Sequence, residues 1–238
     1  MNYFLIVLVA LAPVALLLFY IYKKDPIPEP TPLLRKALLY GALTIIPAAI
    51  IEGIIGALFF NGPTQGVLGA AARAFIMAAI PEESVKLLAL WLLLRKNPYF
   101  DEHFDGVVYA VFISLGFAGV ENIFYLMGNI EDWVSIGIAR ALLAVPGHYA
   151  DGILMGFFYS LYYFVNRSRR NKVLILLAPV IAHGVYDTFA FFGDISNEMG
   201  ILGFFILIFF CIRLHKFSFK KLTSLVKRDN DIFGTYHT

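Results

Sequence analysis

The chain has 238 residues, of which 60% are hydrophobic and 15% are charged, and its formal net charge is +2. A typical soluble domain is about 45–50% apolar and about 25% charged. A soluble protein of this length could not bury so many apolar side chains, and exposed apolar patches aggregate. The composition therefore predicts a membrane protein. It excludes a disordered chain and a nucleic-acid-binding domain, and the single cysteine, Cys211, excludes a disulfide scaffold.

Seven stretches are long and apolar enough to cross a bilayer as helices, which takes about 20 residues each. We therefore expect an all-α, polytopic membrane protein with about seven transmembrane helices, near residues 2–22, 37–60, 67–94, 104–128, 134–165, 173–193 and 199–214. The first stretch has no basic start and no small-residue cleavage site before its end. We interpret it as a retained span and not as a signal peptide.

Basic residues fall in every second connection between these stretches. The connections after the first, third and fifth stretches and the tail after the seventh carry Lys and Arg, whereas the loops near 61–66, 129–133 and 194–198 carry none. Lys and Arg are enriched on the cytoplasmic side of membrane proteins. The alternation predicts an N-terminus outside the cell and a cytoplasmic C-terminus.

The sequence divides into four parts. These are an N-terminal transmembrane helix (1–24), a proline-rich and extended cytoplasmic connector (25–36), a catalytic membrane helix bundle (37–215) and a basic cytoplasmic tail (216–238). We expect the tail to lie on or near the anionic inner leaflet. Because no segment outside the bilayer is long enough to form a functional domain, we expect the protein to act in or beside the lipid bilayer.

Ionisable side chains recur in four consecutive predicted spans, where each costs a few kcal/mol. The polar clusters are Glu82, Glu83 and Lys86 in the third span, Glu121 and Asn122 in the fourth, His148 and Asp151 in the fifth, and His183 and Asp187 in the sixth. At about 1.5 Å per residue, all four clusters lie roughly 15–25 Å from the cytoplasmic end of their helix. A shared depth indicates one site, because separate structural hydrogen bonds would have no common depth.

Spacing along each helix predicts which groups act together. His183 and Asp187 are four residues apart, so they share a face on which the carboxylate can orient the imidazole. His148 and Asp151, three residues apart, are expected to pair in the same way.

The third span carries two adjacent carboxylates. Lys86 shares a face with Glu82 and can neutralise one of them. Glu82 and Glu83 point about 100° apart on a helix, so we expect one to face the site and the other to face a neighbouring helix. Two arginines, Arg73 and Arg140, lie nearer the outer ends of their spans, where we expect structural roles.

This set of side chains suits the hydrolysis of an amide bond. A buried glutamate can take a proton from water, and the resulting hydroxide can attack a carbonyl. Asn122 and a histidine can donate hydrogen bonds to the oxyanion, after which the glutamate protonates the leaving amine. Zinc is the alternative, held by His148, His183 and Glu121, although no HExxH spacing occurs. The sequence leaves both open, and we favour no cofactor.

The four clusters resemble the motifs of the PrsW family of bacterial membrane proteases. The matches are EExxK from Glu82 to Lys86, FxxxEN from Phe117 to Asn122, HxxxG from His148 to Gly152, and an HxxxD-type motif from His183 to Asp187. They occur in the family's order over roughly residues 35–215. The CAAX prenyl endopeptidases and bacteriocin-immunity homologues are more distantly similar, because they carry EExxxR and a histidine where this chain has EExxK and Glu121-Asn122.

The resemblance implies a membrane-embedded endopeptidase of the bacterial cytoplasmic (inner) membrane. Its expected substrate is a single-span membrane protein, an anti-sigma factor cleaved at site 1 in envelope-stress signalling, and no nucleic acid is involved. The family's functional residues correspond to Glu82, Glu83, Glu121, Asn122, His148, His183 and Asp187. The family has been described both as metal-dependent and as glutamate-type, so the resemblance leaves the cofactor open.

Two other functions are compatible with charged groups in the membrane. A proton-linked transporter would also carry buried Glu, His and Asp, but such proteins usually show an inverted repeat, and none is visible in this sequence. A non-catalytic membrane scaffold would use the same residues as structural hydrogen bonds.

Overall fold

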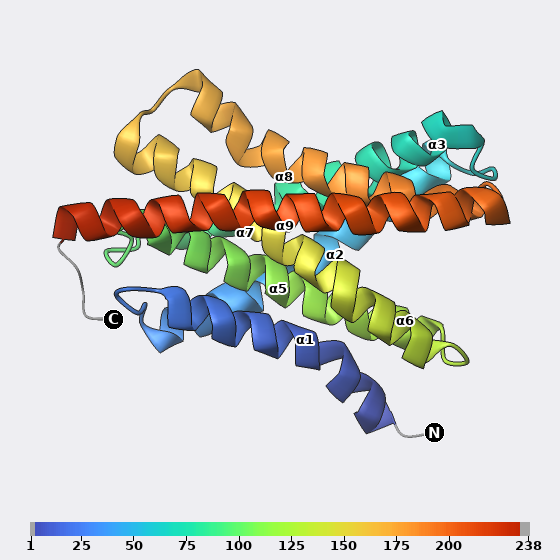
Figure 1. The fold of residues 1–238 in the computed structure, drawn as a ribbon, viewed down its shortest axis with the longest axis horizontal. Helices are drawn as coiled ribbons and strands as arrows, with labels where there is room; N and C mark the ends of the chain where they lie inside the picture. Colours follow the sequence, from blue (N-terminus) through green and yellow to red (C-terminus); the bar gives the residue numbers. More distant parts are fainter. Residues whose placement is uncertain (1–2, 234–238) are drawn as a thin grey trace.

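A computed structural model describes residues 3–233 as a helical bundle (Figure 1). The α-helices are α1 (Tyr3–Lys24), α2 (Thr31–Phe59), α3 (Gly66–Ala72), α4 (Ile80–Leu94), α5 (His103–Gly128), α6 (Trp133–Ala139), α7 (Val145–Ser160), α8 (Arg169–Ala190) and α9 (Asn197–Phe233). Between them lie the π-helical segments η1 (Arg73–Ala79), η2 (Arg140–Ala144) and η3 (Leu161–Val165), and the 3₁₀ segment η4 (Phe191–Asp194). No strand occurs between residues 3 and 233, which confirms the all-α prediction.

Six helical segments are long and apolar enough to cross a membrane: α1, α2, α5, residues 133–165, residues 169–194 and most of α9. The run formed by α3, η1 and α4 is helical throughout, but it carries Arg73, Glu82, Glu83 and Lys86. These charges explain why it is not among the six, although it was one of the seven predicted spans. The polytopic membrane architecture is confirmed, and the count of seven stays a prediction.

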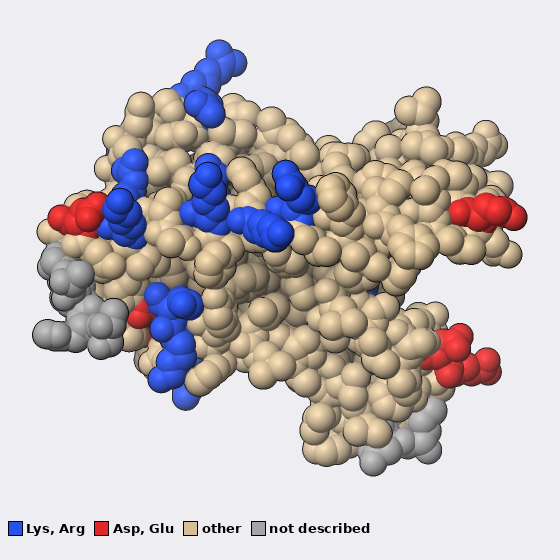
Figure 2. All heavy atoms as spheres, viewed as in Figure 1, with Lys and Arg blue, Asp and Glu red and all other residues tan. Residues whose placement is uncertain are grey.

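The outer surface of the bundle suits a lipid solvent. Large apolar side chains are exposed along α1 and α2, including Leu16, Ile50 and Leu58. Figure 2 shows Lys and Arg gathered toward the end of the molecule where α9 ends, whereas acidic side chains are visible at both ends. The one-sided position of the basic side chains agrees with the alternation of the loops, while the orientation across the membrane itself stays a prediction.

Helix α5 is the central element of the bundle. Most of its side chains are buried, and it packs against α7, α2 and α1. Close crossings depend on glycine: a methyl group at Gly156 of α7 would overlap the backbone of Gly106, and one at Gly116 would overlap that of Leu38 in α2. Because lipid provides no hydrophobic drive between helices, such small residues allow the close packing that holds membrane helices together. These crossings place the polar positions of α5 and α7 side by side.

The last helix is longer than the expected span. α9 continues through residue 216, where a tail was expected, to Phe233, and residues 234–238 lie outside the described residues. Its Asp229 carboxylate accepts the backbone N–H groups of His103 and Phe104 at 3.1 and 2.9 Å. A carboxylate at this position satisfies N–H groups that the first turn of α5 leaves unpaired. This contact fixes the end of α9 against the start of α5.

Candidate active site

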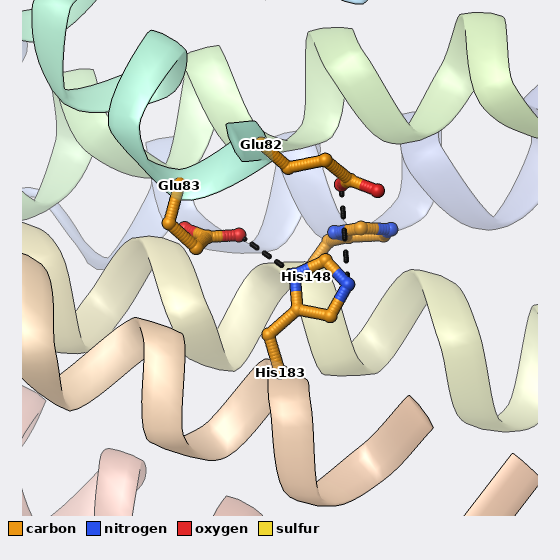
Figure 3. A group of neighbouring side chains, drawn as sticks. All are labelled: Glu82, Glu83, His148 and His183. Carbon is orange, nitrogen blue, oxygen red and sulfur yellow. Dashed lines mark hydrogen bonds and ion pairs between the residues drawn. The ribbon is translucent and has the colours of Figure 1, made fainter. Parts of the chain in front are cut away.

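The polar clusters of four helices meet inside the bundle. Figure 3 shows Glu82 and Glu83 projecting from α4 toward His183 on α8, with His148 of α7 beside them. All four residues are buried, and the two imidazole rings lie edge to face with their centres 5.4 Å apart. The structure thus brings together residues that the sequence separates by up to about 100 positions.

Lys86 holds the two carboxylates of α4. Its Nζ donates to Glu82 Oε2 at 3.1 Å and to Glu83 Oε1 at 2.9 Å, so it contacts both acids and not one as expected. The ammonium also lies 3.9 Å from the centre of the Phe117 ring, a cation–π contact. A buried cation offsets the repulsion between two adjacent buried carboxylates.

His183 lies between acidic groups. Its Nδ1 is 2.9 Å from Glu83 Oε1, and its Nε2 is 3.1 Å from Asp187 Oδ2 and 3.9 Å from Glu82 Oε2. The predicted pairing of His183 with Asp187 therefore has the right geometry. Two ring nitrogens that both face carboxylates fix the orientation of the ring.

His148 takes its partners from other helices. Its Nδ1 accepts from Lys86 Nζ at 3.3 Å, and its Nε2 donates to Glu121 Oε2 at 2.9 Å. The expected pairing with Asp151 is wrong, since neither ring nitrogen contacts that residue and Asp151 Oδ1 is buried without a hydrogen-bond partner. The tautomer of His148 is set by α4 and α5 and not by its own helix.

Arg140 completes the α5 side of the site. Its Nη2 donates to Glu121 Oε2 at 2.6 Å, and its Nε donates to Asn122 Oδ1. These contacts place Arg140 beside the polar cluster, and its expected structural role stays a prediction. Arg73 does fit that expectation, because its guanidinium donates to the backbone carbonyls of Phe60 and Gly62.

The Asn122 side chain contacts α1 and Arg140 and does not point at the four residues of Figure 3. Its side-chain N–H donates to the backbone carbonyl of Ala10 in α1 at 3.1 Å, and the residue is almost wholly buried. At least one N–H of the amide is therefore already used in a contact with α1, and Asn122 does not line the cavity described below, whereas the sequence predicted that this amide binds an oxyanion. Its contact with Arg140 places it as a support for that guanidinium.

Two of the four helices that supply these residues, α4 and α7, begin in the same way. A π-helical segment, η1 or η2, leads into a helix with proline in its first turn, Pro81 before Glu82 and Pro146 before His148. Proline lacks an N–H and cannot close the usual backbone bond, and π-helical turns frequently occur at functional sites. The irregular backbone thus occurs directly before the residues that converge.

A cavity of about 280 Å³ opens beside these groups. Its polar wall is formed by Glu52, Glu82, Glu121, Arg140, His148, Asp151, His183 and Asp187, and most of the remaining wall is apolar. Glu83 does not line it, and one of its oxygens is buried without a partner. The two neighbouring glutamates therefore differ: Glu82 reaches the cavity and Glu83 lies behind it.

The cluster has the donors of a metal site. One ligand atom from each of Glu82, Glu83, His148 and His183 lies within 4.8 Å of the others. Two imidazoles and a carboxylate are a donor set that zinc uses in catalytic sites. The unpartnered Glu83 oxygen also fits a role as ligand. Glu121, expected as a ligand, lies outside this group because it contacts His148 Nε2 and Arg140.

A family model described as PrsW family intramembrane metalloprotease matches residues 29–214. The chain belongs to the PrsW family. This confirms the resemblance drawn from the four motifs and makes the protein a membrane protease. With its membrane helices, the chain is a multi-pass protein of the bacterial cytoplasmic membrane. The transporter and scaffold alternatives are set aside on the same ground.

Several PrsW relatives are similar over most of their length. Protease PrsW of Geobacillus kaustophilus is 36% identical over 187 residues, covering 77% of this chain and 79% of the relative. Protease PrsW of Clostridioides difficile is 32% identical over 231 residues, covering 95% and 93%. Protease PrsW of Bacillus subtilis is 34% identical over 187 residues, covering 77% and 82%. No solved structure matches the chain.

Two residues that line the cavity were not among the predicted site residues. Arg140 was expected near the outer interface, and its partners Glu121 and Asn122 lie on another helix. Glu52 of α2 was left unassigned and lines the cavity. Neither has a same-helix partner of the kind that spacing can detect.

Proposed function

We propose that this PrsW-family protease hydrolyses a peptide bond of a single-span membrane protein, with Glu82 as the base that activates water. The observation that carries the proposal is the position of Glu82. It is the carboxylate of the α4 pair that reaches the cavity, while His183 and Lys86 hold it in place.

The reaction follows from the residues around the cavity. Glu82 takes a proton from water, and the hydroxide attacks the carbonyl carbon of the scissile bond. The guanidinium of Arg140, which also lines the cavity, supplies positive charge near the oxyanion. Glu82 then gives the proton to the departing amine, so no covalent intermediate forms.

The other predicted residues orient this machinery. Glu121 fixes the tautomer of His148, and Asp187 and Glu83 fix the ring of His183. Asn122 positions Arg140 through its carbonyl oxygen. A zinc ion, held by Glu83, His148 and His183, would make a bound water more acidic and polarise the carbonyl.

The location of the site supports a substrate anchored in the membrane. Glu121 and His183 each lie seven residues from the end of their helix, roughly 10 Å, and by the predicted orientation that end faces outward. A cleavage on the outer side of a single span is what site-1 processing requires. We therefore infer that the substrate is an anti-sigma factor and that the cleavage starts an envelope-stress response.

The test is cleavage in proteoliposomes. The purified protease is combined, one at a time, with the single-span anti-sigma factors of the same bacterium, and products are identified by mass spectrometry. Cleavage near the outer end of one span is expected. Cleavage of other single-span proteins but of no anti-sigma factor would refute the substrate, and the absence of any peptide cleavage would refute the function.

A separate measurement of metal content tests whether zinc is a cofactor of this site. Purified protein is assayed for bound zinc, and cleavage is measured before and after chelation and after zinc is restored. Loss and recovery of activity would assign zinc to this site. Full activity in zinc-free protein would leave Glu82 as the sole activator of water.

A further inference from the structure

A second cavity, of about 680 Å³, lies between α7, α8 and α9, away from the active site. Its wall is mostly apolar, and its polar side chains are Arg170, Asn171 and Lys221. Arg170 and Asn171 are at the start of α8, and Lys221 is in the last third of α9. The polar groups therefore gather at one end of the cavity, and by the predicted orientation this is the cytoplasmic end.

The two cations of this cavity have no acidic partner within the part of the chain that the structure describes. Among residues 3–233, neither Arg170 nor Lys221 forms an ion pair with a carboxylate. Lys221 Nζ instead lies 4.9 Å from the ring centre of Phe157 and 5.1 Å from that of Phe217. Figure 2 shows further Lys and Arg side chains over this part of the molecule. The rim thus offers positive charge that no carboxylate of residues 3–233 neutralises through an ion pair.

The dimensions of the cavity match one leaflet of a bilayer. From Arg170 to Ala182 on α8 is 12 residues, roughly 18 Å, and from Phe210 to Lys221 on α9 is 11 residues, roughly 16 Å. Half of the hydrocarbon core of a bilayer is about 15 Å. A complete transmembrane segment of a substrate would need about 30 Å of groove, so this cavity is too short for it.

We propose that this cavity binds an anionic glycerophospholipid of the inner leaflet, with its phosphate between Arg170 and Lys221 and its acyl chains against α7, α8 and α9. Basic pockets between transmembrane helices on the cytoplasmic side are known to suit anionic headgroups. The apolar wall ends at Ala182, the residue before His183. A bound lipid therefore also supports the segment of α8 that carries a site histidine.

The test is native mass spectrometry of the full-length protein in detergent, with phosphatidylglycerol or phosphatidylcholine of identical acyl chains. The wild type should retain phosphatidylglycerol at least about fivefold better than phosphatidylcholine. The double variant Arg170→Gln with Lys221→Gln should lose most of this preference. The matched control, Lys172→Gln with Lys220→Gln, makes the same charge change at exposed positions of the same helices that do not line the cavity, and should keep it.

A second variant tests the contact of the acyl chains with the apolar wall of the cavity. Ala178→Trp, in the cavity wall, should reduce the retention of phosphatidylglycerol by at least about fivefold. Equal retention of the two lipids by the wild type would overturn the proposal, as would equal losses in the test and control double variants. Unchanged retention in folded Ala178→Trp would place the lipid elsewhere and overturn it too. Because the readout is binding, these outcomes do not depend on protease activity.

Discussion

His183 Nδ1 lies 2.9 Å from Glu83 Oε1, although 100 residues separate the two in the chain. The other ring nitrogen faces Asp187 at 3.1 Å, so either the imidazole donates from both nitrogens or a neighbouring carboxyl holds a proton. In both cases the ring is fixed from two sides. Glu83 thereby orients the His183 ring, whereas Glu82 is the glutamate of the pair that lines the cavity.

Replacement of Arg140 tests the α5 side of the site. Arg140→Gln leaves the largely buried Glu121 carboxylate without its cation, and we expect a loss of about 3 kcal/mol in stability and at least a tenfold loss of cleavage. Arg140→Lys should recover little, because an ammonium cannot contact Glu121 and Asn122 with two separate N–H groups in the same geometry. Thermal unfolding and cleavage rates measure both effects.

Arg73→Gln is the matched control for Arg140. Arg73 also begins a π-helical segment, but its guanidinium contacts backbone carbonyls outside the cluster. The Arg73→Gln variant should cleave within about twofold of the wild-type rate. Equal activity losses at the two arginines would contradict the specific role of Arg140.

The crossing of α5 and α7 should not tolerate a methyl group. Gly156→Ala places a Cβ against the backbone of Gly106, which cannot rotate away, and overpacking of this kind costs about 1–3 kcal/mol. Gly53→Ala on α2, where nothing lies within 4 Å, should be neutral or stabilising by up to about 1 kcal/mol. Melting temperatures in detergent compare the two. A Gly156→Ala protein as stable as the wild type would show that the helices are not in close contact.

Much of the fold and part of the site followed from the sequence. Hydropathy predicted the helices, and a shared depth predicted that Glu82, His148 and His183 would meet. Both predictions were possible because hydropathy and depth can each be read from the sequence of one helix. Same-helix spacing also predicted the His183–Asp187 pair correctly.

The partners of His148 could not be predicted in this way. They come from α4 and α5, and which helices become neighbours depends on close crossings such as Gly156 against Gly106. Arg140 was missed for the same reason, since its partners lie on α5. Spacing within a helix carries no information on contacts between helices.

Asp229 should stabilise the fold from the far end of α9. Asp229→Ala removes the acceptor for two N–H groups at the start of α5, and the loss of such a cap costs about 0.5–2 kcal/mol. Asp231→Ala, at an exposed position two residues on, should change stability by only a few tenths of a kcal/mol. Thermal unfolding of the two variants side by side is the measurement. The same melting temperature for both would mean that the cap contributes nothing.

Acidic groups near the connector predict a pH dependence. Burial, followed by the charge of Glu29, raises the pKa of Asp25 to about 8 from 3.8, and burial with the charge of Asp229 raises the pKa of Glu102 to about 7 from 4.5. A raised folded-state pKa of an acid gives stability that is complete below the unfolded value and is lost as pH rises through the folded value.

The melting temperature should therefore fall as pH rises from about pH 4 to about pH 8, between the unfolded and the folded pKa values. Asp25→Asn cannot ionise and should flatten this fall, whereas the exposed Asp231→Asn should leave it unchanged. A wild-type melting temperature that rises over this interval would contradict the sign of the effect.

The most direct test of the account is the cleavage rate of Glu82→Gln in proteoliposomes with a single-span substrate. The variant keeps the shape of the side chain but cannot accept the proton, so we predict a loss of at least about a hundredfold in a protein that still folds. Glu131→Gln, in an exposed loop, should cleave at the wild-type rate. A folded Glu82→Gln protein that cleaves as fast as the wild type would show that Glu82 is not the base.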